Sequence, residues 1–304
     1  MNIAIFSQCF WPDTASVAQH LYDLSLELSK KGHKISVYTS QFSYEDKSIK
    51  YPKIENHKGI KIERLYHSHF GKKSIIGRAI DFISFNFACF LPILFLNKNK
   101  IDAIIAMPPP PLLPFLVSFM AKRKDIPFIY WAMDLQPELS YATGLLNEGS
   151  IIGWLLNKFN SYTIKNSEKI IALDDQMKKY LIEKGGSKNK ISSIPVWQVM
   201  KKYYSGNRLS NPFRIENNFG NKIVVMYSGN YGNAHPVDTL LDAALQLKEE
   251  DSILFVFIGG GTQYSKVKHQ RTELGCNNII QLPYQPRENI HISLASADFH
   301  VVVL

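Results

Sequence analysis

Apolar and polar residues follow one another along this chain in the rhythm of repeated strand–helix units. Residues 2–6 form a short apolar run, and residues 14–31 then place leucines at the i, i+3 and i+7 spacing of one helix face. A Gly–His pair ends that pattern, and residues 34–39 return to an apolar run rich in β-branched side chains. A strand, a helix and a second strand in this order predict two parallel strands joined by a crossover helix.

The same rhythm continues to about residue 195. Further strands are predicted near 60–66, 101–106, 126–131, 168–172 and 191–194, and helices near 73–96, 111–123, 150–166 and 174–184. Residues 41–58 are polar, lysine-rich and without a period, so they are predicted to form a loop. The expected fold of this half is a parallel sheet with helices on both faces.

A break in the pattern separates this half from a second series. We expect a first domain over 1–200, a linker over 201–221 and a second α/β domain over 222–304. The second series is short and stops inside the apolar run Val301–Leu304. Parallel strands are normally covered by helices on both faces, so we expect the second domain to be incomplete and the chain to be C-terminally truncated.

Composition narrows the class of protein. The chain has 304 residues, of which 45% are hydrophobic and 20% charged, and this excludes a disordered chain, a collagen-like repeat or a disulfide-stapled miniprotein. Its three cysteines, Cys9, Cys89 and Cys276, are far apart and form no CxxC pair. A reducing cytoplasm is therefore the expected compartment.

The positive charge is concentrated in the first half. The formal net charge is +9, and residues 28–100 alone hold 14 basic and 5 acidic side chains. Such an excess predicts an anionic partner, namely lipid head groups, nucleic acid or a phosphorylated substrate. No basic recognition helix or aromatic RNA-binding pattern accompanies it, so nucleic acid is not expected as a partner.

Within this basic stretch, residues 75–96 are conspicuously apolar. The run of fifteen from Phe82 to Leu96 contains Pro92 and falls short of the roughly 20 residues that a transmembrane helix needs. Two interpretations stay open. The segment is either a buried helix of the first domain or a helix lying in the interface of a membrane, with Lys and Arg on the anionic head groups.

Two glycine-rich loops of the second domain are candidates for binding phosphate. Ser228–Asn233 and Gly259–Gly261 each follow a predicted strand and precede a predicted helix, and glycine lets backbone N–H groups approach an anion closely. Neither matches the GxGxxG fingerprint, and each taken alone could be a plain tight turn. Their recurrence in successive units favours a binding site at the carboxyl edge of the strands. His235, beside the first loop, is the one histidine singled out.

Two carboxylates, Asp134 and Glu138, are the candidate catalytic residues. They follow the strand that ends at Trp131, where they could bind sugar hydroxyls or act as acid or base. The alternative is that they cap a helix N-terminus. The loop Phe10–Thr14 after the first strand leaves the same choice open. The chain has no Asp-x-Asp pair and no zinc-ligand spacing, so no metal and no other cofactor is expected.

Several segments together resemble glycosyltransferase family 4, and within it the subgroup that builds colanic acid and O-antigen polysaccharides. The segments are FSQCFWPDTASVAQHLYDLSLELSKKGHKISVYTS at 6–40, MPPPPLL at 107–113, DLQPELSYATGLL at 134–146, MYSGNYGNAHPVDTLLDAA at 226–244, FVFIGGGTQYSKV at 255–267 and LPYQPRENIHISLASADFHVVVL at 282–304. The resemblance implies the GT-B fold of two Rossmann-like domains with doubly wound parallel sheets, the second being incomplete here. It also implies transfer of a sugar from a nucleotide-sugar, without a metal and with retention of anomeric configuration.

The resemblance assigns roles to named positions. The implied donor-binding residues are Ser228, Gly229, Asn230, Gly232, His235, Gly259, Gly260, Gly261, Gln281, Pro283 and Tyr284. The implied acceptor-side loop contains Pro12, Asp13, Ala15 and Ser16. The chain departs from the family pattern where Ala15–Ser16 replace a Gly–Gly pair and where Asn230 and His235 stand in place of a phosphate-clamping Arg and Lys. The Glu-x7-Glu stretch of the family would begin beyond Leu304.

The expected function is synthesis of a surface polysaccharide. The chain would move a sugar from a nucleotide-sugar to a polyprenyl-diphosphate-linked saccharide at the inner face of the cytoplasmic membrane, which its basic half would contact, and truncation would impair this activity. Two alternatives remain, namely a non-catalytic remnant that binds a membrane or a partner, and a nucleotide-sugar 2-epimerase of the same fold.

Overall fold

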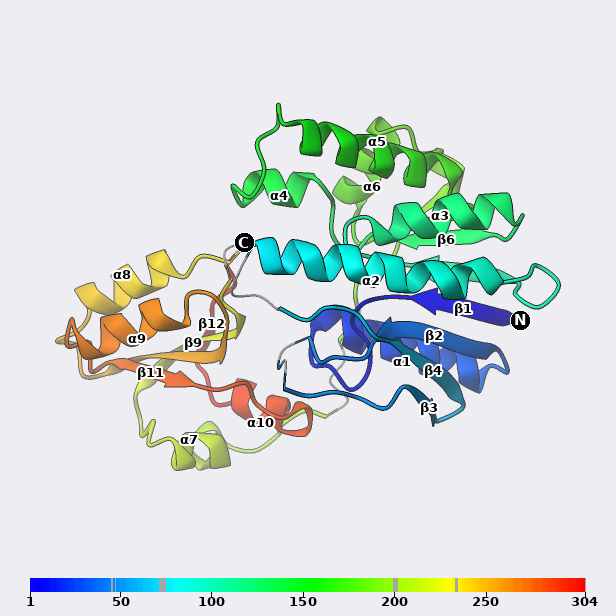
Figure 1. The fold of residues 1–304 in the computed structure, drawn as a ribbon. Coiled ribbons are helices and arrows are strands. Elements are labelled where there is room, and N and C mark those ends of the chain that lie inside the picture. Colours follow the sequence, from blue (N-terminus) through cyan, green and yellow to red (C-terminus); the bar gives the residue numbers. More distant parts are fainter. Residues whose placement is uncertain (45, 47, 71–74, 199–201, 233–234, 304) are drawn as a thin grey trace. The chain divides into compact units, whose positions relative to one another are not determined.

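The computed structural model describes residues 1–44, 46, 48–70, 75–198, 202–232 and 235–303. The chain forms two compact units that divide at residues 199 and 200. Each unit has its own sheet and its own hydrophobic core (Figure 1). The fold class predicted from the sequence, two Rossmann-like α/β units, is confirmed.

Unit 1 is built on a sheet of eight strands in the order β3-β4-β2-β1-β5-β6-β7-β8. The strands are β1 Asn2–Phe6, β2 Lys34–Ser40, β3 Ile54–His57, β4 Ile60–Leu65, β5 Ala103–Ala106, β6 Phe128–Trp131, β7 Lys169–Ala172 and β8 Ile191–Ser193. Every neighbouring pair is parallel except β3 with β4. The chain order reverses between β1 and β5, and this is where ligands bind in doubly wound sheets.

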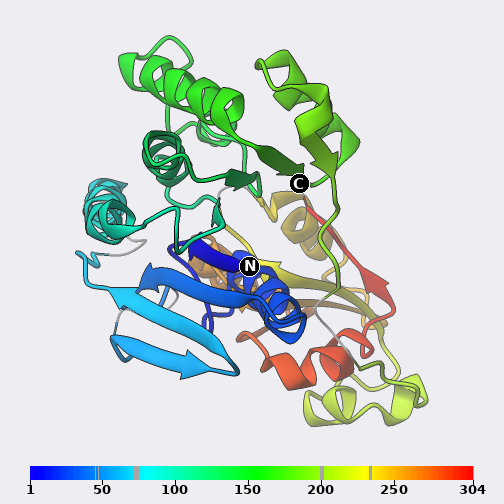
Figure 2. The ribbon, with the colours of Figure 1, turned by 90° about the vertical axis from the view of Figure 1, so that its right-hand side faces the viewer.

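Helices cover both faces of this sheet. They are α1 Ser16–Lys30, α2 Ile75–Phe95, α3 Leu113–Arg123, α4 Glu138–Ala142, α5 Ile151–Asn166 and α6 Asp175–Glu183, with the 3-10 turn η1 Lys188–Lys190. Side chains of β1 alternate between the faces: Phe6 packs in the core that holds α2 and α3, whereas Ile5 packs in the core that holds α1. The view along the sheet places α1 on the opposite side of the strands from α2 and α3 (Figure 2).

The structure corrects the prediction that residues 41–58 form a loop, because residues 54–57 form β3. Its pairing with β4 runs Ile54↔Glu63 to His57↔Ile60, and the two-residue connection Lys58–Gly59 has φ of 50° and 81°. Positive φ at both positions is the geometry of the tight hairpin turn that suits the twist of two strands. Strand β3 carries Glu55, Asn56 and His57 at the edge of the sheet, so it has no apolar run from which to predict it.

Unit 2 has four parallel strands in the order β11-β10-β9-β12. The strands are β9 Ile223–Asn230, β10 Ile253–Gly260, β11 Ile279–Leu282 and β12 Phe299–His300. The helices are α7 Pro212–Glu216, α8 Asp238–Gln246, α9 Tyr264–Thr272 and α10 Ile290–Leu294, with 3-10 turns η2 Arg208–Ser210 and η3 Arg287–Asn289. Helices α8 and α9 pack on one face of the sheet, and α7 and α10 on the other.

The segment expected as a linker, 201–221, contains η2 and α7. Arg214 of α7 is buried and donates hydrogen bonds to the carbonyls of Gly220 (2.9 Å) and Ser296 (2.7 Å). Its guanidinium also lies 3.4 Å from the carboxylate of Asp298, which accepts a hydrogen bond from the backbone N–H of Val224. These contacts attach the segment to the start of β9 and β12.

Helix α2 has 21 residues and agrees with the helix predicted near 73–96. Over Ile76–Phe95 it is long and apolar enough to cross a membrane, and only 22% of an 18-residue window in this stretch is buried. However, Phe85, Cys89 and Ile93 are fully buried in the core of unit 1, so one face of α2 is packed against a folded domain. One face of α2 is thus buried in the first domain, as the first interpretation expects, and exposed residues such as Ile76 and Phe87 keep the interfacial interpretation open.

Candidate active site

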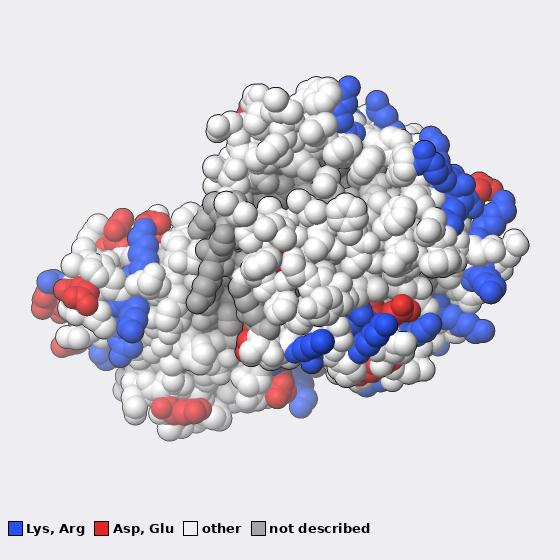
Figure 3. All heavy atoms as spheres, in the orientation of Figure 1, with Lys and Arg blue, Asp and Glu red and all other residues white. Residues whose placement is uncertain are grey.

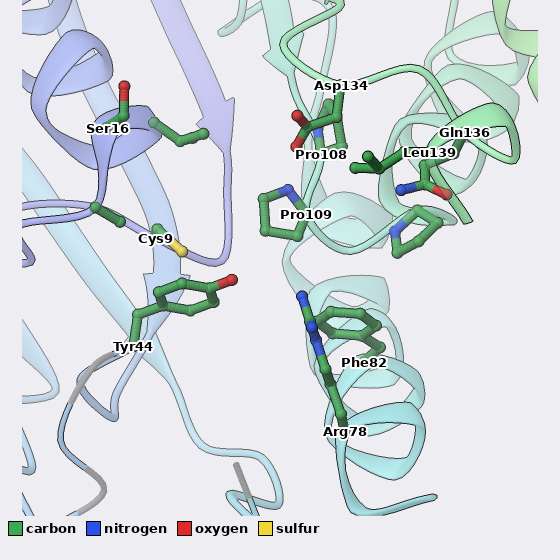
Figure 4. Close-up of a pocket in the computed structure, with 13 residues that line it drawn as sticks. Cys9, Ser16, Tyr44, Arg78, Phe82, Pro108, Pro109, Asp134, Gln136 and Leu139 are labelled. Atoms are coloured by element: carbon green, nitrogen blue, oxygen red, sulfur yellow. The ribbon is translucent and has the colours of Figure 1, made fainter. Parts of the chain in front are cut away.

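A pocket in unit 1 opens beside β1 and β5, the strands between which the strand order of the sheet reverses (Figure 4). The ends of β1 and β5 contribute Cys9 and Pro108, and the segment after β6 contributes Asp134. The full set of lining residues is Cys9, Ala15, Ser16, Val17, Tyr44, Arg78, Phe82, Pro108, Pro109, Pro111, Asp134, Gln136 and Leu139. The pocket therefore occupies the position that the strand order favours for a ligand.

The pocket has one carboxylate and one guanidinium on its wall. Asp134 points into it from the segment after β6, and Arg78 points into it from the first turns of α2, beside Phe82 (Figure 4). The Arg78 guanidinium lies over the Phe82 ring, 5.2 Å from its centroid. Such a pocket can hold a ligand that offers hydroxyl groups to a carboxylate and an anionic group to a cation.

The structure decides against helix capping as the role of Asp134. The N-cap of α4 is Pro137, and no side chain accepts a hydrogen bond there. Asp134 lies three residues before that cap and lines the pocket. The functional interpretation of Asp134 is thereby favoured, and its catalytic role stays a prediction.

Glu138 has different surroundings. It begins α4 and is not among the residues that line the pocket. Its carboxylate accepts a hydrogen bond from the Tyr180 hydroxyl and lies 3.1 Å from the Lys184 ammonium, so it connects α4 to α6. Burial raises the pKa of the neighbouring Tyr130 hydroxyl, and the negative charges of Asp134 and Glu138 raise it further. These contacts favour a positioning role for Glu138.

The predicted acceptor-side loop is divided by the structure. Ala15 and Ser16, at the start of α1, line the pocket. Pro12 is exposed, and buried Asp13 accepts hydrogen bonds from the Ser43 and Tyr51 hydroxyls and from the backbone N–H of Tyr44, each at 3.1 Å. Burial raises the pKa of Tyr51 to about 12. Asp13 thus holds in place the loop from which Tyr44 reaches the pocket.

In unit 2 the two glycine loops lie side by side at the carboxyl ends of β9 and β10. Gly259 pairs with Gly229 and Gly260 with Asn230. Gly259 has φ of 129°, and a Cβ there would lie 2.0 Å from the Gly229 carbonyl oxygen; Gly261 has φ of 140°, with the Tyr231 oxygen at 2.6 Å from its would-be Cβ. Only glycine permits this backbone conformation and this close approach, which leaves open backbone at the sheet edge.

The implied donor-binding residues Gln281, Pro283 and Tyr284 take different positions. The exposed Tyr284 ring lies against Gly260, with its hydroxyl 3.3 Å from the Gly260 carbonyl oxygen. Pro283 is exposed beside it. Gln281 donates hydrogen bonds to the Tyr264 carbonyl (3.0 Å) and the Tyr231 hydroxyl (3.3 Å). Its amide nitrogen therefore bonds to neighbouring residues of unit 2.

The Gln263 side chain is hydrogen-bonded to the first glycine loop. Its amide nitrogen donates to the carbonyls of Gly232 (2.8 Å) and His235 (3.3 Å), whereas Ser228 and Asn230 are exposed. The Nδ1 atom of His235 is buried and has no hydrogen-bond partner among the described residues. A buried polar atom without a partner at this edge is consistent with a ligand contact. Asn233 of this loop lies outside the described residues.

Ten of the thirteen lining residues were not predicted from the sequence, among them Tyr44, Arg78, Phe82 and Gln136. Arg78 carried a signal, since it is the one cation between Ile75 and Phe95, but nothing in the sequence tells which way it points. No group of three or more His, Cys, Asp or Glu side chains suited to a metal occurs among the described residues. The expectation that no metal is needed stays a prediction.

Comparison with known proteins agrees with this architecture. The model of Glycosyltransferase Family 4 matches residues 17–196, more than half of the chain, and that of Glycosyl transferases group 1 matches residues 211–303. The chain belongs to glycosyltransferase family 4, and the predicted family and enzyme class are confirmed.

Three similar proteins illustrate the relationship. The putative colanic acid biosynthesis glycosyl transferase WcaI of Escherichia coli K12 is 20% identical over all of this chain and 76% of its own length. The structure of sucrose-phosphate synthase from Thermosynechococcus elongatus matches with a TM-score of 0.75 at 15% identity, over 99% of this chain and 75% of that one. HepE of Anabaena, solved with UDP-glucose, matches with a TM-score of 0.68 at 16% identity, over 99% of this chain and 73% of that one.

Proposed function

We propose that the chain transfers a sugar from a nucleotide-sugar to a polyprenyl-diphosphate-linked saccharide during synthesis of a surface polysaccharide. The observation that carries the proposal is the unit 1 pocket, where one carboxylate and one guanidinium face the same space in a member of this family. The similarity to WcaI supports polysaccharide synthesis, and that to HepE supports a nucleotide-sugar donor.

The acceptor saccharide would occupy the unit 1 pocket. Asp134 would accept a hydrogen bond from the attacking hydroxyl and take its proton, which makes the oxygen a better nucleophile. The oxygen would bond to the anomeric carbon on the face from which the nucleotide diphosphate leaves, as the bond between sugar and diphosphate breaks. Arg78 would bind a phosphate of the lipid carrier, since a guanidinium presents paired N–H donors to phosphate oxygens. The apolar side chains of Phe82 and Leu139 would contact the sugar rings or the first isoprene units.

The donor would bind at the glycine loops of unit 2. Its diphosphate would lie against the backbone at Gly229 and Gly259–Gly261, with Asn230, Gly232 and His235 beside it. Its base would contact Pro283 and the exposed Tyr284 ring. No metal and no other cofactor is invoked, and the configuration at the anomeric carbon would be retained.

This reaction would place the enzyme at the inner face of the cytoplasmic membrane. A polyprenyl-diphosphate is anchored in the bilayer, and the basic residues of the first half would attract the chain to anionic lipids. The proposed localisation is therefore cytoplasmic, with peripheral attachment.

The test is direct product analysis. The chain is incubated with a panel of nucleotide-sugars and a short-chain polyprenyl-diphosphate-linked saccharide, and the products are examined by mass spectrometry and by the anomeric coupling constants in NMR. Appearance of a longer saccharide with the donor's anomeric configuration supports the proposal. Epimerised nucleotide-sugar formed without acceptor would support the 2-epimerase alternative, and absence of both turnover and nucleotide affinity would support the non-catalytic remnant.

A further inference from the structure

Exposed apolar side chains follow one face of α2 from its first turn to its last. They are spaced alternately four and three residues apart and include Phe87, 74% exposed. We call these residues the α2 outer face: Ile76, Ile80, Ile83, Phe87, Phe90 and Leu94. Their spacing keeps them on one side of the helix, opposite the buried residues Phe85, Cys89 and Ile93.

The α2 outer face carries no charge of its own. Between Ala79 and Asn97 the only charged side chain is Asp81. Asp81 is buried, and its carboxylate accepts hydrogen bonds from the Ser68 hydroxyl and the Phe70 backbone N–H, both at 2.9 Å. An exposed apolar face without charges along a 21-residue helix is far from the usual surface of a soluble domain.

Basic residues gather where α2 ends. Lys98 and Lys100 follow the helix, and Lys122 and Arg123 close the neighbouring helix α3. Lys124 donates to the carbonyls of Leu94 (2.6 Å) and Leu96 (3.0 Å), which places its ammonium at the end of α2. Within unit 1, the space-filling view shows a broad uncharged area over α2 with Lys and Arg along its right-hand margin (Figure 3).

We infer that the α2 outer face inserts into the boundary between head groups and acyl chains of an anionic bilayer, with α2 lying parallel to the membrane surface. An apolar helix face with a basic margin has the chemistry of an interfacial helix. A second copy of this chain is a poorer occupant, because it would bring an equal positive charge against that margin. Crossing the bilayer is excluded by the buried face of α2.

The two sides of α2 would then have different functions, one lining the pocket and the other inserting into the membrane. Arg78 and Phe82, on the side away from the outer face, line the unit 1 pocket. Insertion of the outer face would hold that pocket at the level of the lipid head groups, where the phosphates of a lipid-linked acceptor lie. This last consequence rests on the proposed function, whereas the insertion itself does not.

Vesicle flotation tests the inference with the full chain. The double variant Ile83→Glu/Phe87→Glu changes two side chains that are 52% and 74% exposed, so the fold should persist, and circular dichroism checks this. The control is Leu209→Glu/Ile215→Glu, which places the same two charges on residues of η2 and α7 in unit 2 that are 49% and 63% exposed. The vesicles are phosphatidylcholine with and without phosphatidylglycerol.

The wild type and the control should float with the anionic vesicles. The double variant should bind them about a hundredfold more weakly, roughly tenfold for each apolar side chain withdrawn from lipid. The wild type should also bind neutral vesicles about tenfold more weakly than anionic ones, because the basic margin loses its partner. Equal flotation of wild type and double variant would overturn the inference, as would a wild type that does not float but forms a dimer that the double variant abolishes.

A second pair of measurements separates this inference from the proposed function. Asp134→Asn should float like the wild type even though its kcat should be about a hundredfold lower, and the double variant should keep its affinity for the nucleotide-sugar. If the wild type floats as described but no transfer is detected with any donor, the proposed function fails and the membrane helix stands.

Discussion

Asp134 and Glu138 are four residues apart in the sequence, yet only Asp134 lines the pocket. Asp134→Asn keeps the size of the side chain and removes its ability to accept a proton. We expect kcat to fall by about a hundredfold or more, since general base catalysis contributes on that order, while donor affinity stays unchanged. Steady-state kinetics and calorimetric titration of the nucleotide-sugar measure the two effects. Asp125→Asn, at an exposed carboxylate on the surface, is the control and should leave kcat unaltered.

Glu138 should behave as a structural residue by the same measurements. Glu138→Gln weakens the hydrogen bond from Tyr180 and removes the charge attraction to Lys184. We expect the free energy of unfolding to fall by about 1–2 kcal/mol, with kcat reduced far less than in Asp134→Asn. Denaturant titration gives the stability, and Lys184→Gln completes a double-mutant cycle that should show coupling between the pair. If Glu138→Gln lowers kcat as much as Asp134→Asn does and leaves the stability unchanged, the positioning role is wrong and Glu138 is a catalytic residue.

Asp134 could be predicted from the sequence because a carboxylate directly after an apolar strand can be recognised from the order of residues alone. Arg78 and Tyr44 reach the pocket from an apolar helix and from a polar loop, and their placement depends on how α2 and the loop held by Asp13 pack in three dimensions. No spacing in the sequence encodes that packing. The candidate site was therefore predicted in part, through the residues that follow strands.

Among the elements, the contact between the two glycine loops gives a sharp test. Gly259→Ala would force a Cβ to within 2.0 Å of the Gly229 carbonyl oxygen at a positive φ, whereas the nearest atom to a Cβ on Gly229 is the Tyr227 hydroxyl at 3.6 Å. We expect Gly259→Ala to destabilise unit 2 by about 3 kcal/mol. Gly229→Ala should change the free energy of unfolding by less than about 0.5 kcal/mol, yet it should weaken nucleotide binding because the methyl group lies where the diphosphate is proposed to bind.

Thermal unfolding and nucleotide titration of the two variants check this pair. Equal stability of Gly259→Ala and Gly229→Ala would contradict the close approach of β9 and β10. Unchanged nucleotide affinity in a folded Gly229→Ala variant would remove this loop from the proposed donor site.

The central elements were predictable because buried parallel strands and amphipathic helices have strong periodic patterns. β3 and α7 were not predictable from such patterns, for two different reasons. β3 lies at the sheet edge with polar side chains, so its pairing depends on the backbone and on the Lys58–Gly59 turn. α7 is five residues long and is held by one buried arginine, and two partners of that arginine, Ser296 and Asp298, lie more than eighty residues further along the chain.

At the scale of the whole molecule, the two units have separate cores and should respond separately to ligand. Asp298→Asn weakens contacts with Arg208, Arg214 and Val224 within unit 2, so it should lower the unfolding temperature of that unit only. This variant therefore marks the calorimetric transition that belongs to unit 2. A nucleotide that binds at the glycine loops should raise the same transition, by about 2.7 kcal/mol of free energy at a hundredfold excess over Kd. If the nucleotide instead raises the transition that Asp298→Asn leaves unchanged, the donor binds in unit 1, and the assignment of the unit 1 pocket to the acceptor fails with it.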